Sequence, residues 1–374
     1  MLGLYVHIPF CLKRCHYCDF VITTERSHQR FADALEQEIR QAAAVAGPQA
    51  FDTLYFGGGT PSQLTEAEFT RLFKQLRSAF VIKPKAEITC ELNPDDSTPE
   101  KLQLYKQLGV NRISVGAQSF NDTLLKRMGR AHDSAAVYSA LDQLRAAGFA
   151  NISADLILKL PGQTLQDVSH SVNELIRLGA SQLVLYDLDV HEKTVFGLQR
   201  RQNRLTLPPD TLHEAMFARA QSLLVQAGYR QYEVSSFARS GSESRHNLIY
   251  WKNFSFLGLG PGAFSYIDGV RSRLASDVRR YLDKCERGDW VPDEAETIGE
   301  KDRQIETLLT GLRLSDGIAP GDFPALESAL AETIPPLAEQ GLLEYTDGKV
   351  RLTARGTFTA ESIIQHLVTH SMSA

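Results

Sequence analysis

Near its beginning the chain reads Tyr5-Val6-His7-Ile8-Pro9-Phe10-Cys11-Leu12-Lys13-Arg14-Cys15-His16-Tyr17-Cys18-Asp19-Phe20. An apolar run typical of a strand leads directly into three cysteines with the spacing C-x3-C-x2-C. The two other cysteines, Cys90 and Cys285, lie far away in the sequence. An odd number of cysteines, three of them close together, argues against a disulfide framework. The segment therefore predicts a metal site or a reactive thiol in the loop after a strand.

Three closely spaced thiolates suit two kinds of metal centre. They can hold three irons of a [4Fe–4S] cluster, which leaves the fourth iron open to a small molecule. They can also bind zinc together with His16 or His7. Covalent attachment of a c-type haem is excluded, because Asp19 and not histidine follows Cys18. The spacing favours the cluster and leaves zinc as the alternative.

Outward from this segment, apolar strand-like runs alternate with amphipathic helical stretches, which predicts parallel βαβ units. Six such units predict an α/β fold, a partial (βα)6 TIM-like barrel whose functional residues gather at the C-terminal ends of the strands. Gly109, Gly148 and Gly179 each follow a helical stretch and are expected to end it in a left-handed turn. The strand-like runs are Leu4–Ile8, Thr53–Phe56, Ala86–Glu91, Val110–Val115, Ile152–Leu158 and Leu183–Leu188.

The alternation of strand-like and helical stretches ends after about residue 205. We expect a barrel domain over 1–205, an extension over 206–289, and a mostly helical, winged-helix-like domain over 290–374. The last assignment depends on a hairpin pattern around Asp347-Gly348 between two helical patterns. Winged helices often bind DNA, but acidic side chains in the expected recognition region favour a packing or lid domain. These acidic residues are Glu327, Glu332 and Glu339.

The composition excludes several classes of protein. The 374 residues are 43% hydrophobic and 23% charged, as in ordinary globular proteins. A net charge of −5 without a basic block disfavours nucleic acid as a partner. No stretch approaches the 18 apolar residues of a membrane span, and Met1–His7 lacks the basic region of a signal peptide. We expect a cytoplasmic protein, with peripheral contact at the inner membrane compatible with the sequence.

Two motifs stand where the second and third strands are expected to end. Phe56-Gly57-Gly58-Gly59-Thr60-Pro61 lets the backbone approach a ligand closely, because glycine has no side chain. A tight turn alone rarely needs three glycines. Glu91 is suited to a cationic amine or a ribose hydroxyl, although a carboxylate at such a position is more often a solvated strand end.

Three more polar residues lie on, or directly after, predicted strands and are candidate ligand contacts for the same reason. Gln118 ends the fourth predicted strand, Arg130 lies in the loop after it, and Asp155 lies on the fifth. Lone polar residues at such positions are structural about as often as they bind a ligand. A glycine-rich segment, Gly258–Ala263, matches a dinucleotide fingerprint, but Pro261 interrupts it and no helix is expected to follow. A nicotinamide site is therefore disfavoured.

Taken together, these motifs resemble the radical S-adenosylmethionine (SAM) superfamily over nearly the whole chain. The resemblance is to the branch that holds oxygen-independent coproporphyrinogen III dehydrogenases and HemW haem chaperones. It implies a [4Fe–4S] cluster on Cys11, Cys15 and Cys18. It also implies one or two SAM molecules in contact with Tyr5, Tyr17, Gly57, Gly58, Gly59, Thr60, Glu91, Gln118, Arg130 and Asp155.

The segment His246-Asn247-Leu248-Ile249-Tyr250-Trp251 resembles the HNxxYW signature of the haem chaperones, which the dehydrogenases lack. The dehydrogenases also carry a longer N-terminal extension and a fourth cysteine where this chain has Phe20. Two residues depart from the pattern of the branch. Phe264 replaces a usual histidine, and Lys159 replaces a usual glycine.

The resemblance thus implies a haem chaperone that binds haem and delivers it to acceptor proteins, including respiratory, membrane-associated ones. A reductant for the cluster is a further expected partner. His246 is the candidate axial haem ligand, because neutral imidazole often takes this role and Tyr250 and Trp251 offer flat faces to a porphyrin. Without the resemblance, His246 would be expected to cap a turn beside two core aromatic residues.

Two alternatives stay open at this point. One is the radical SAM dehydrogenase, which oxidatively decarboxylates the propionates of coproporphyrinogen III. The other is a cluster-bearing structural or regulatory protein without a haem role.

Overall fold

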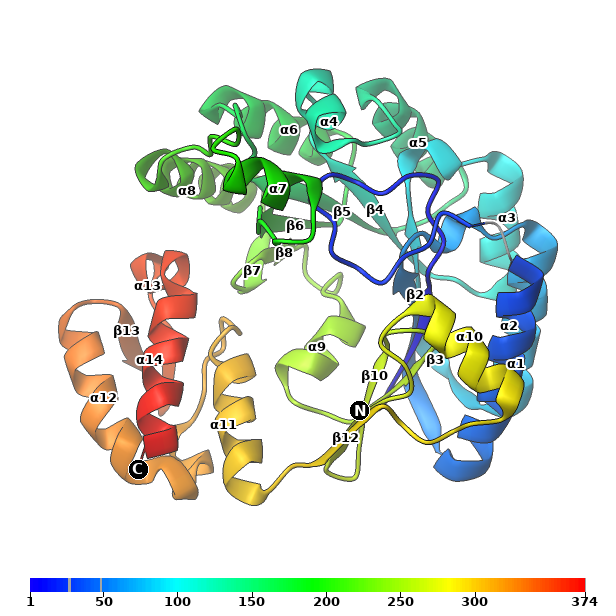
Figure 1. The fold of residues 1–374 in the computed structure, drawn as a ribbon. Helices are drawn as coiled ribbons and strands as arrows, with labels where there is room; N and C mark the ends of the chain where they lie inside the picture. The colour runs from blue at the N-terminus through cyan, green and yellow to red at the C-terminus, as the bar shows by residue number, and fades with distance from the viewer. Residues whose placement is uncertain (26–27, 48, 374) are drawn as a thin grey trace.

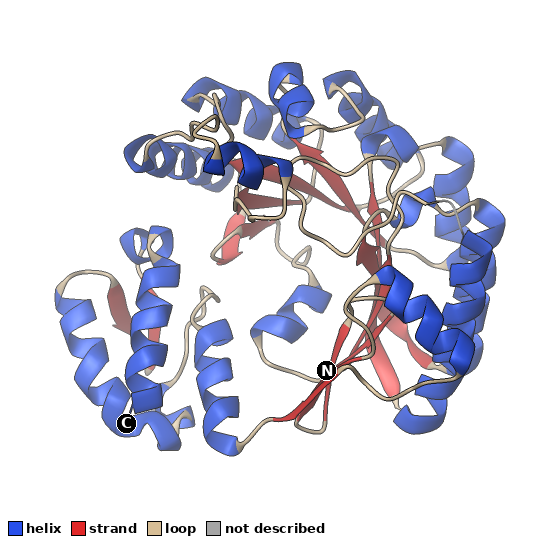
Figure 2. Ribbon diagram, viewed as in Figure 1, coloured by secondary structure: helices blue, strands red, loops and turns tan. Residues whose placement is uncertain are grey.

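The computed structural model describes residues 1–25, 28–47 and 49–373. A large open sheet carries helices on its outer face, and a smaller, mostly helical unit lies beside it (Figures 1 and 2). In the described part of the chain, no helix is both long and apolar enough to cross a membrane.

Six parallel strands form the centre of the sheet, side by side in sequence order. They do not close into a full barrel, because further strands extend both edges of the sheet. The expected α/β partial barrel is therefore confirmed. The central strands are β1 (Gly3–Ile8), β2 (Ala50–Gly58), β3 (Val81–Leu92), β4 (Arg112–Gln118), β5 (Asn151–Leu158) and β6 (Gln182–Asp187).

Helices follow each of these strands and cover the convex side of the sheet (Figure 1). Most of their apolar faces pack on the strands in one core, whereas the two short helices at 122–128 and 195–201 contribute to a second cluster that includes Ile157 and Leu188. The expected glycine stops are also confirmed, since φ is 97° at Gly109, 78° at Gly148 and 75° at Gly179. The helices are α1 (His28–Ala46), α2 (Glu66–Ala79), α3 (Pro99–Leu108), α4 (Asp122–Met128), α5 (Ser134–Ala146), α6 (Leu165–Arg177), α7 (Val195–Arg201) and α8 (Asp210–Gln226).

Residues 206–297 supply strands to both edges of the same sheet, so its last strand lies beyond residue 289, where the expected extension ends. On one side β9 (Phe256–Leu259) runs parallel to β1 and is followed by β10 (Phe264–Ile267), β11 (Val270–Arg273) and β12 (Glu294–Thr297). On the other side β8 (Ser236–Ala238) pairs antiparallel with β6, and β7 (Arg230–Glu233) follows it. Between them lies α9 (Arg245–Trp251), and α10 (Val278–Arg287) packs on α1. This part of the chain thus extends the open sheet at both edges and shares its core.

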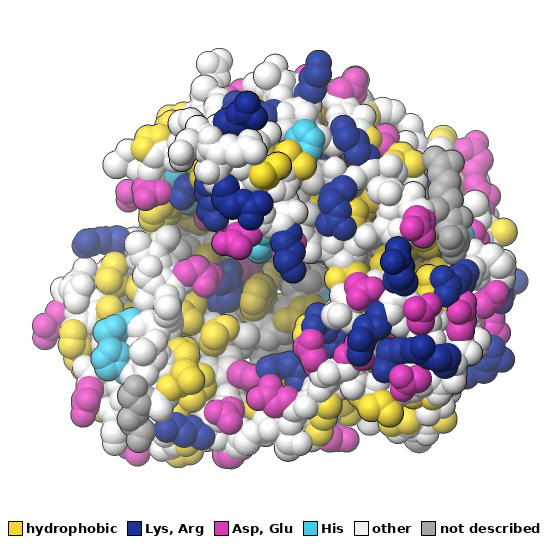
Figure 3. Space-filling model, viewed as in Figure 1, with side chains coloured by type: hydrophobic (Ala, Val, Ile, Leu, Met, Phe, Trp, Pro, Cys, Tyr) yellow, Lys and Arg dark blue, Asp and Glu magenta, His cyan; other side chains and the backbone are white. Residues whose placement is uncertain are grey.

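The C-terminal unit has a hydrophobic core of its own. A two-stranded hairpin lies between helices, as the Asp347-Gly348 pattern predicts, and φ is positive at both turn residues. Its elements are α11 (Glu300–Gly311), α12 (Glu327–Glu339), β13 (Leu343–Thr346), β14 (Lys349–Leu352), α13 (Ala354–Phe358) and α14 (Ala360–Ser373). Figure 3 shows a hollow in the surface between this unit and the barrel, and basic and acidic side chains interspersed over the face drawn.

Candidate functional site

The three-cysteine loop leaves the C-terminal end of β1, where parallel α/β folds gather their functional groups. Backbone hydrogen bonds return the loop to its starting point, because Thr23 donates to the Pro9 carbonyl at 2.8 Å and Cys11 donates to the Thr23 carbonyl at 3.0 Å. His7 adds a side-chain anchor, with 2.7 Å between its Nε2 and the Val21 carbonyl. The loop is therefore held at both ends.

The thiols of Cys11, Cys15 and Cys18 face one cavity of about 580 Å³. Cys11 Sγ lies 3.4 Å from the Thr60 hydroxyl, and Arg130 Nη1 lies 3.6 Å from Cys15 Sγ. Burial raises the pKa of the Cys11 thiol to about 11. Cationic irons favour the thiolate form that such a buried thiol otherwise resists.

The other two cysteines lie outside this cavity. Cys90 is buried on β3 and Cys285 is buried on α10. Among the described residues, no three His, Cys, Asp or Glu side chains stand close enough to hold a single metal ion. The zinc alternative gains no support from this geometry, whereas a four-iron cluster is wider than one ion and does not require such close ligands.

Two half-buried carboxyl groups, those of Glu91 and Asp155, also line the cavity. Glu91 accepts hydrogen bonds from the Tyr55 hydroxyl at 2.8 Å and from the Gly58 amide at 3.2 Å. Burial, with Glu91 as a second cause, raises the pKa of Asp155 to about 7, and burial also raises the pKa of Glu91. A cationic ligand would favour the ionised form of both groups.

Close packing explains the glycine run. A Cβ on Gly57 would lie 2.8 Å from Tyr55 Cε1 and 3.0 Å from Glu91 Oε1, and a Cβ on Gly58 would lie 2.5 Å from the His7 ring. Gly57 itself does not line the cavity, whereas Gly58, Gly59 and Thr60 do. The motif therefore serves both packing and access to the cavity.

The remaining expected SAM contacts, except Tyr5, also line this cavity. Gln118 has a φ of 65° and its buried Oε1 has no hydrogen-bond partner. Arg130 is fixed by Asn93 Oδ1 at 2.6 Å and by the Gly116 carbonyl at 3.0 Å. Tyr17 lies beside Cys18 in the wall. The structure thus brings together residues from five different strand ends.

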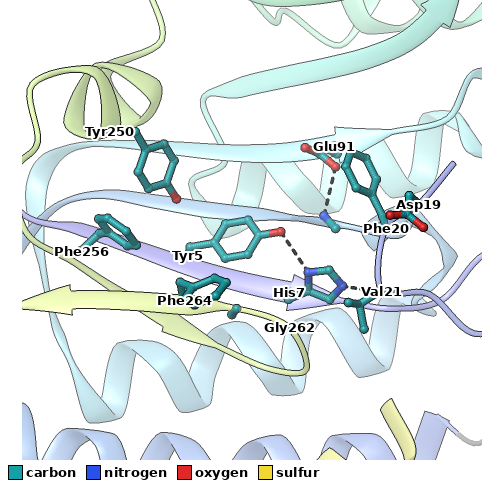
Figure 4. Close-up of a pocket in the computed structure, with 12 residues that line it drawn as sticks. Tyr5, His7, Asp19, Phe20, Val21, Glu91, Tyr250, Phe256, Gly262 and Phe264 are labelled. Atoms are coloured by element: carbon teal, nitrogen blue, oxygen red, sulfur yellow. Dashed lines mark hydrogen bonds between the residues drawn. The ribbon is translucent and has the colours of Figure 1, made fainter. Parts of the chain in front are cut away.

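Tyr5 lies elsewhere, in a second pocket of about 380 Å³ (Figure 4). This pocket lies next to the cavity that the three thiols face. Asp19, Phe20, Gly58 and Glu91 line both spaces, so the two adjoin. The second pocket is rich in aromatic side chains from five segments of the chain: Tyr5, Phe20, Tyr250, Phe256 and Phe264.

His246 lies away from both spaces. Its residue is only 1% exposed, its Nδ1 lies 2.7 Å from the Thr53 hydroxyl, and its Nε2 lies 2.9 Å from the Tyr250 hydroxyl. Burial lowers the pKa of His246 to about 3, so the ring is neutral. Because both ring nitrogens already have partners, this geometry argues against His246 as the axial haem ligand.

Trp251 also differs from the expectation of a porphyrin contact. The guanidinium of Arg313, in the C-terminal unit, lies 4.8 Å from the centre of a Trp251 ring. The HNxxYW segment therefore presents Tyr250 to the second pocket and Trp251 to the C-terminal unit.

Sequence reasoning missed the pocket as a site and missed Asn93 as the partner of Arg130. The aromatic residues of the segment 229–266 were a visible signal, but nothing in the sequence placed Phe256 and Phe264 opposite Tyr5. Asn93 follows Glu91 closely and stands at the same strand end, which is the one signal that pointed to it.

Comparisons with known proteins agree with this arrangement. Residues 5–175 match the family model of the Radical SAM superfamily, and residues 299–359 match that of the HemN C-terminal domain. The E. coli coproporphyrinogen III oxidase (HemN) structure has a TM-score of 0.87 and 25% identity, over 99% of this chain and 90% of that one.

Two curated relatives are each named heme chaperone HemW. The protein from Bacillus subtilis (strain 168) is 37% identical over 97% of this chain and 98% of that protein. The protein from Escherichia coli (strain K12) is 29% identical over 97% of each. The chain therefore belongs to the HemW family of the radical SAM superfamily.

Proposed function

We propose that this protein holds a [4Fe–4S] cluster on Cys11, Cys15 and Cys18, binds SAM beside it, and binds haem for delivery to acceptor proteins. The observation that carries the proposal is the convergence of three thiols and two half-buried carboxyl groups on one cavity, with an aromatic pocket adjoining it. The names of the curated relatives support the haem role.

The side chains around the cavity have distinct tasks in this proposal. A bound cluster with an open iron supplies a chelation site and an electron. Arg130 sits between Cys15 and Asn93 and offsets the negative charge of the thiolates. The backbone of Gly58 and Gly59 lies open to an amino group of SAM, and Glu91 offers a carboxylate for its cationic or hydroxyl groups. Gln118 and Asp155 supply further polar contacts from β4 and β5.

The aromatic pocket is the proposed place for the flat face of a porphyrin. The haem then goes to acceptor proteins, including respiratory, membrane-associated ones, and an electron donor reduces the cluster. We place the protein in the cytoplasm, with peripheral contact at the inner membrane during delivery. No role for nucleic acid is proposed.

The competing enzymatic function is oxidative decarboxylation of coproporphyrinogen III. It draws on the same fold, since the coproporphyrinogen III oxidase structure is similar over nearly the whole chain. Phe20 argues against it, because its ring, 68% exposed between the cavity and the pocket, stands where the dehydrogenases carry a fourth thiol.

The deciding experiment is titration of ferric haem into the anaerobically reconstituted protein, followed by transfer to a haem-free acceptor. Stoichiometric haem binding followed by transfer supports the chaperone. Conversion of coproporphyrinogen III to protoporphyrinogen IX without haem transfer would support the enzyme. Failure of both would leave a cluster-bearing structural or regulatory role.

The cluster and SAM are tested separately from haem. Replacing Cys11, Cys15 or Cys18 with Ala should remove the iron–sulfur absorbance, whereas Cys285→Ala should keep it. SAM should perturb the EPR signal of the reduced wild-type cluster, and Asp155→Ala should weaken this perturbation with iron and sulfide retained. Full iron and sulfide in the triple Cys→Ala variant, or uptake of zinc alone, would refute the cluster assignment.

A further inference from the structure

The aromatic pocket contains a tyrosine whose hydroxyl lies beside the ring of Tyr5 and is hydrogen-bonded to a buried histidine. Tyr250, on α9, lines the pocket, and its hydroxyl points into it toward the ring of Tyr5 (Figure 4). Phe256 packs edge-on against Tyr250, with 4.7 Å between the ring centres. The hydroxyl therefore lies beside apolar rings, while the other polar side chains of the pocket are those of Tyr5, His7, Asp19 and Glu91.

A hydrogen bond fixes the position of this hydroxyl. Tyr250 Oη lies 2.9 Å from His246 Nε2, and His246 Nδ1 is held in turn by the Thr53 hydroxyl. The imidazole also stacks on Tyr55, with 4.9 Å between the ring centres. The Thr53 hydroxyl can donate to Nδ1, and the neutral ring then carries its proton on Nε2 and donates it to the Tyr250 oxygen, so this hydrogen bond persists when the phenol loses its own proton.

The other phenol and the histidine of the pocket belong to a different hydrogen-bond chain, and Glu91 is held by Tyr55 and Gly58. Tyr5 Oη lies 3.1 Å from His7 Nδ1, and His7 Nε2 must carry a proton because its partner at 2.7 Å is the Val21 carbonyl. Tyr5 and His7 thus belong to the hydrogen-bond chain that anchors the cysteine loop. Breaking this chain would release the loop that carries the thiols.

We propose that Tyr250 is the axial ligand of ferric haem in the aromatic pocket, and that His246 positions its hydroxyl by hydrogen bonding. Phenolate oxygen is an established type of haem ligand, and it suits the ferric state. This inference rests on the proposed function, because it assigns the ligand of the haem that the protein is proposed to carry.

The ligand exchange balances without a redox partner. Ferric haem arrives with hydroxide in an axial position. The iron–hydroxide bond breaks, the bond between iron and Tyr250 oxygen forms, and the phenol proton leaves with the hydroxide as water. The iron stays ferric throughout.

The test is ferric-haem binding by full-length, cluster-loaded protein, followed by resonance Raman spectroscopy and haem EPR. The wild type should show an iron–phenolate stretching band and a high-spin ferric signal. Tyr250→Phe should lose this band and bind ferric haem about tenfold or more weakly. His246→Ala should keep the band at a shifted frequency. Tyr345→Phe, an exposed tyrosine on the C-terminal hairpin, is the matched control and should behave as wild type.

A ligand swap guards against a folding artefact. Tyr250→His should restore haem binding with an imidazole spectrum in place of the phenolate band, and its iron and sulfide content should equal that of the wild type. Persistence of the phenolate band and affinity in Tyr250→Phe would overturn the assignment. Loss of ligation in His246→Ala alone would instead identify His246. Absence of haem binding by the wild type would refute the proposed function and not only this inference.

Discussion

At the scale of single residues, Lys159 adopts a backbone conformation that favours glycine. Its φ is 62°, and an ion pair of 3.0 Å joins its Nζ to the exposed Asp210. A left-handed conformation costs a residue with a Cβ about 1–2 kcal/mol, whereas an exposed ion pair contributes about 0–1 kcal/mol. Lys159→Gly should therefore have a higher free energy of unfolding than Lys159→Ala by about 1 kcal/mol, because both lose the ion pair and only glycine relieves the backbone. Denaturant unfolding measures this, and equal stabilities would contradict it.

Glu38 is a second residue with a measurable consequence. It accepts hydrogen bonds from the Tyr281 hydroxyl at 2.7 Å and from the Gly260 amide at 2.8 Å, and burial raises its pKa from 4.5 to about 7. A raised carboxyl pKa stabilises the fold below the unfolded pKa, and this stabilisation is lost as the pH rises toward 7. Glu38→Gln should therefore gain stability relative to wild type between pH 4.5 and 7, by on the order of 2–3 kcal/mol. Parallel stability curves over this pH range would contradict the prediction.

At the scale of elements, the start of α9 is fixed by a buried carboxylate. Glu87 on β3 accepts hydrogen bonds from the backbone amides of Arg245 at 3.1 Å and His246 at 3.0 Å. Glu87→Gln keeps the shape but removes the charge, so the free energy of unfolding should fall by about 1–3 kcal/mol. Because α9 also carries Tyr250, ferric-haem affinity should fall while iron and sulfide content is retained.

The matched control for this element is Glu344→Gln. Glu344 forms an exposed pair with Arg351 on the C-terminal hairpin, so its loss should change stability by less than about 1 kcal/mol. Equal effects of the two substitutions on unfolding or on haem affinity would show that Glu87 has no special role at α9.

At the scale of the whole molecule, the buried apolar residues of the barrel and those of the C-terminal unit form separate hydrophobic clusters, which divide near residue 299. Residues 206–289 share the barrel core, because β9 pairs with β1 and β8 pairs with β6. We therefore expect residues 299–374 to unfold cooperatively on their own in a thermal circular dichroism scan. A 1–205 fragment should aggregate, since β1 and β6 become unprotected edges, whereas 1–298 should stay monomeric. A monomeric, cooperatively folding 1–205 fragment would contradict this division.

Local sequence patterns were enough to predict the alternating barrel, the loop that carries three cysteines after the first strand, and the glycine stops. Each of these follows from short-range physics: apolar periodicity, ligand spacing, and the freedom of glycine at positive φ. The same reasoning predicted that Glu91 and Asp155 share one cavity, because the C-terminal ends of parallel strands meet at one face.

Tertiary structure alone decided the arrangement around the HNxxYW segment. Strand β9 pairs with β1 although the two are distant in sequence, and this pairing brings Phe256 and Phe264 to Tyr5. The burial of His246 against Thr53 and Tyr55 depends on the same long-range packing, so its loss of open ring nitrogens was not visible in the sequence. A sequence motif can identify the residues of a site. The direction of each side chain, however, depends on contacts between strands that are distant in sequence, and local patterns do not predict these contacts.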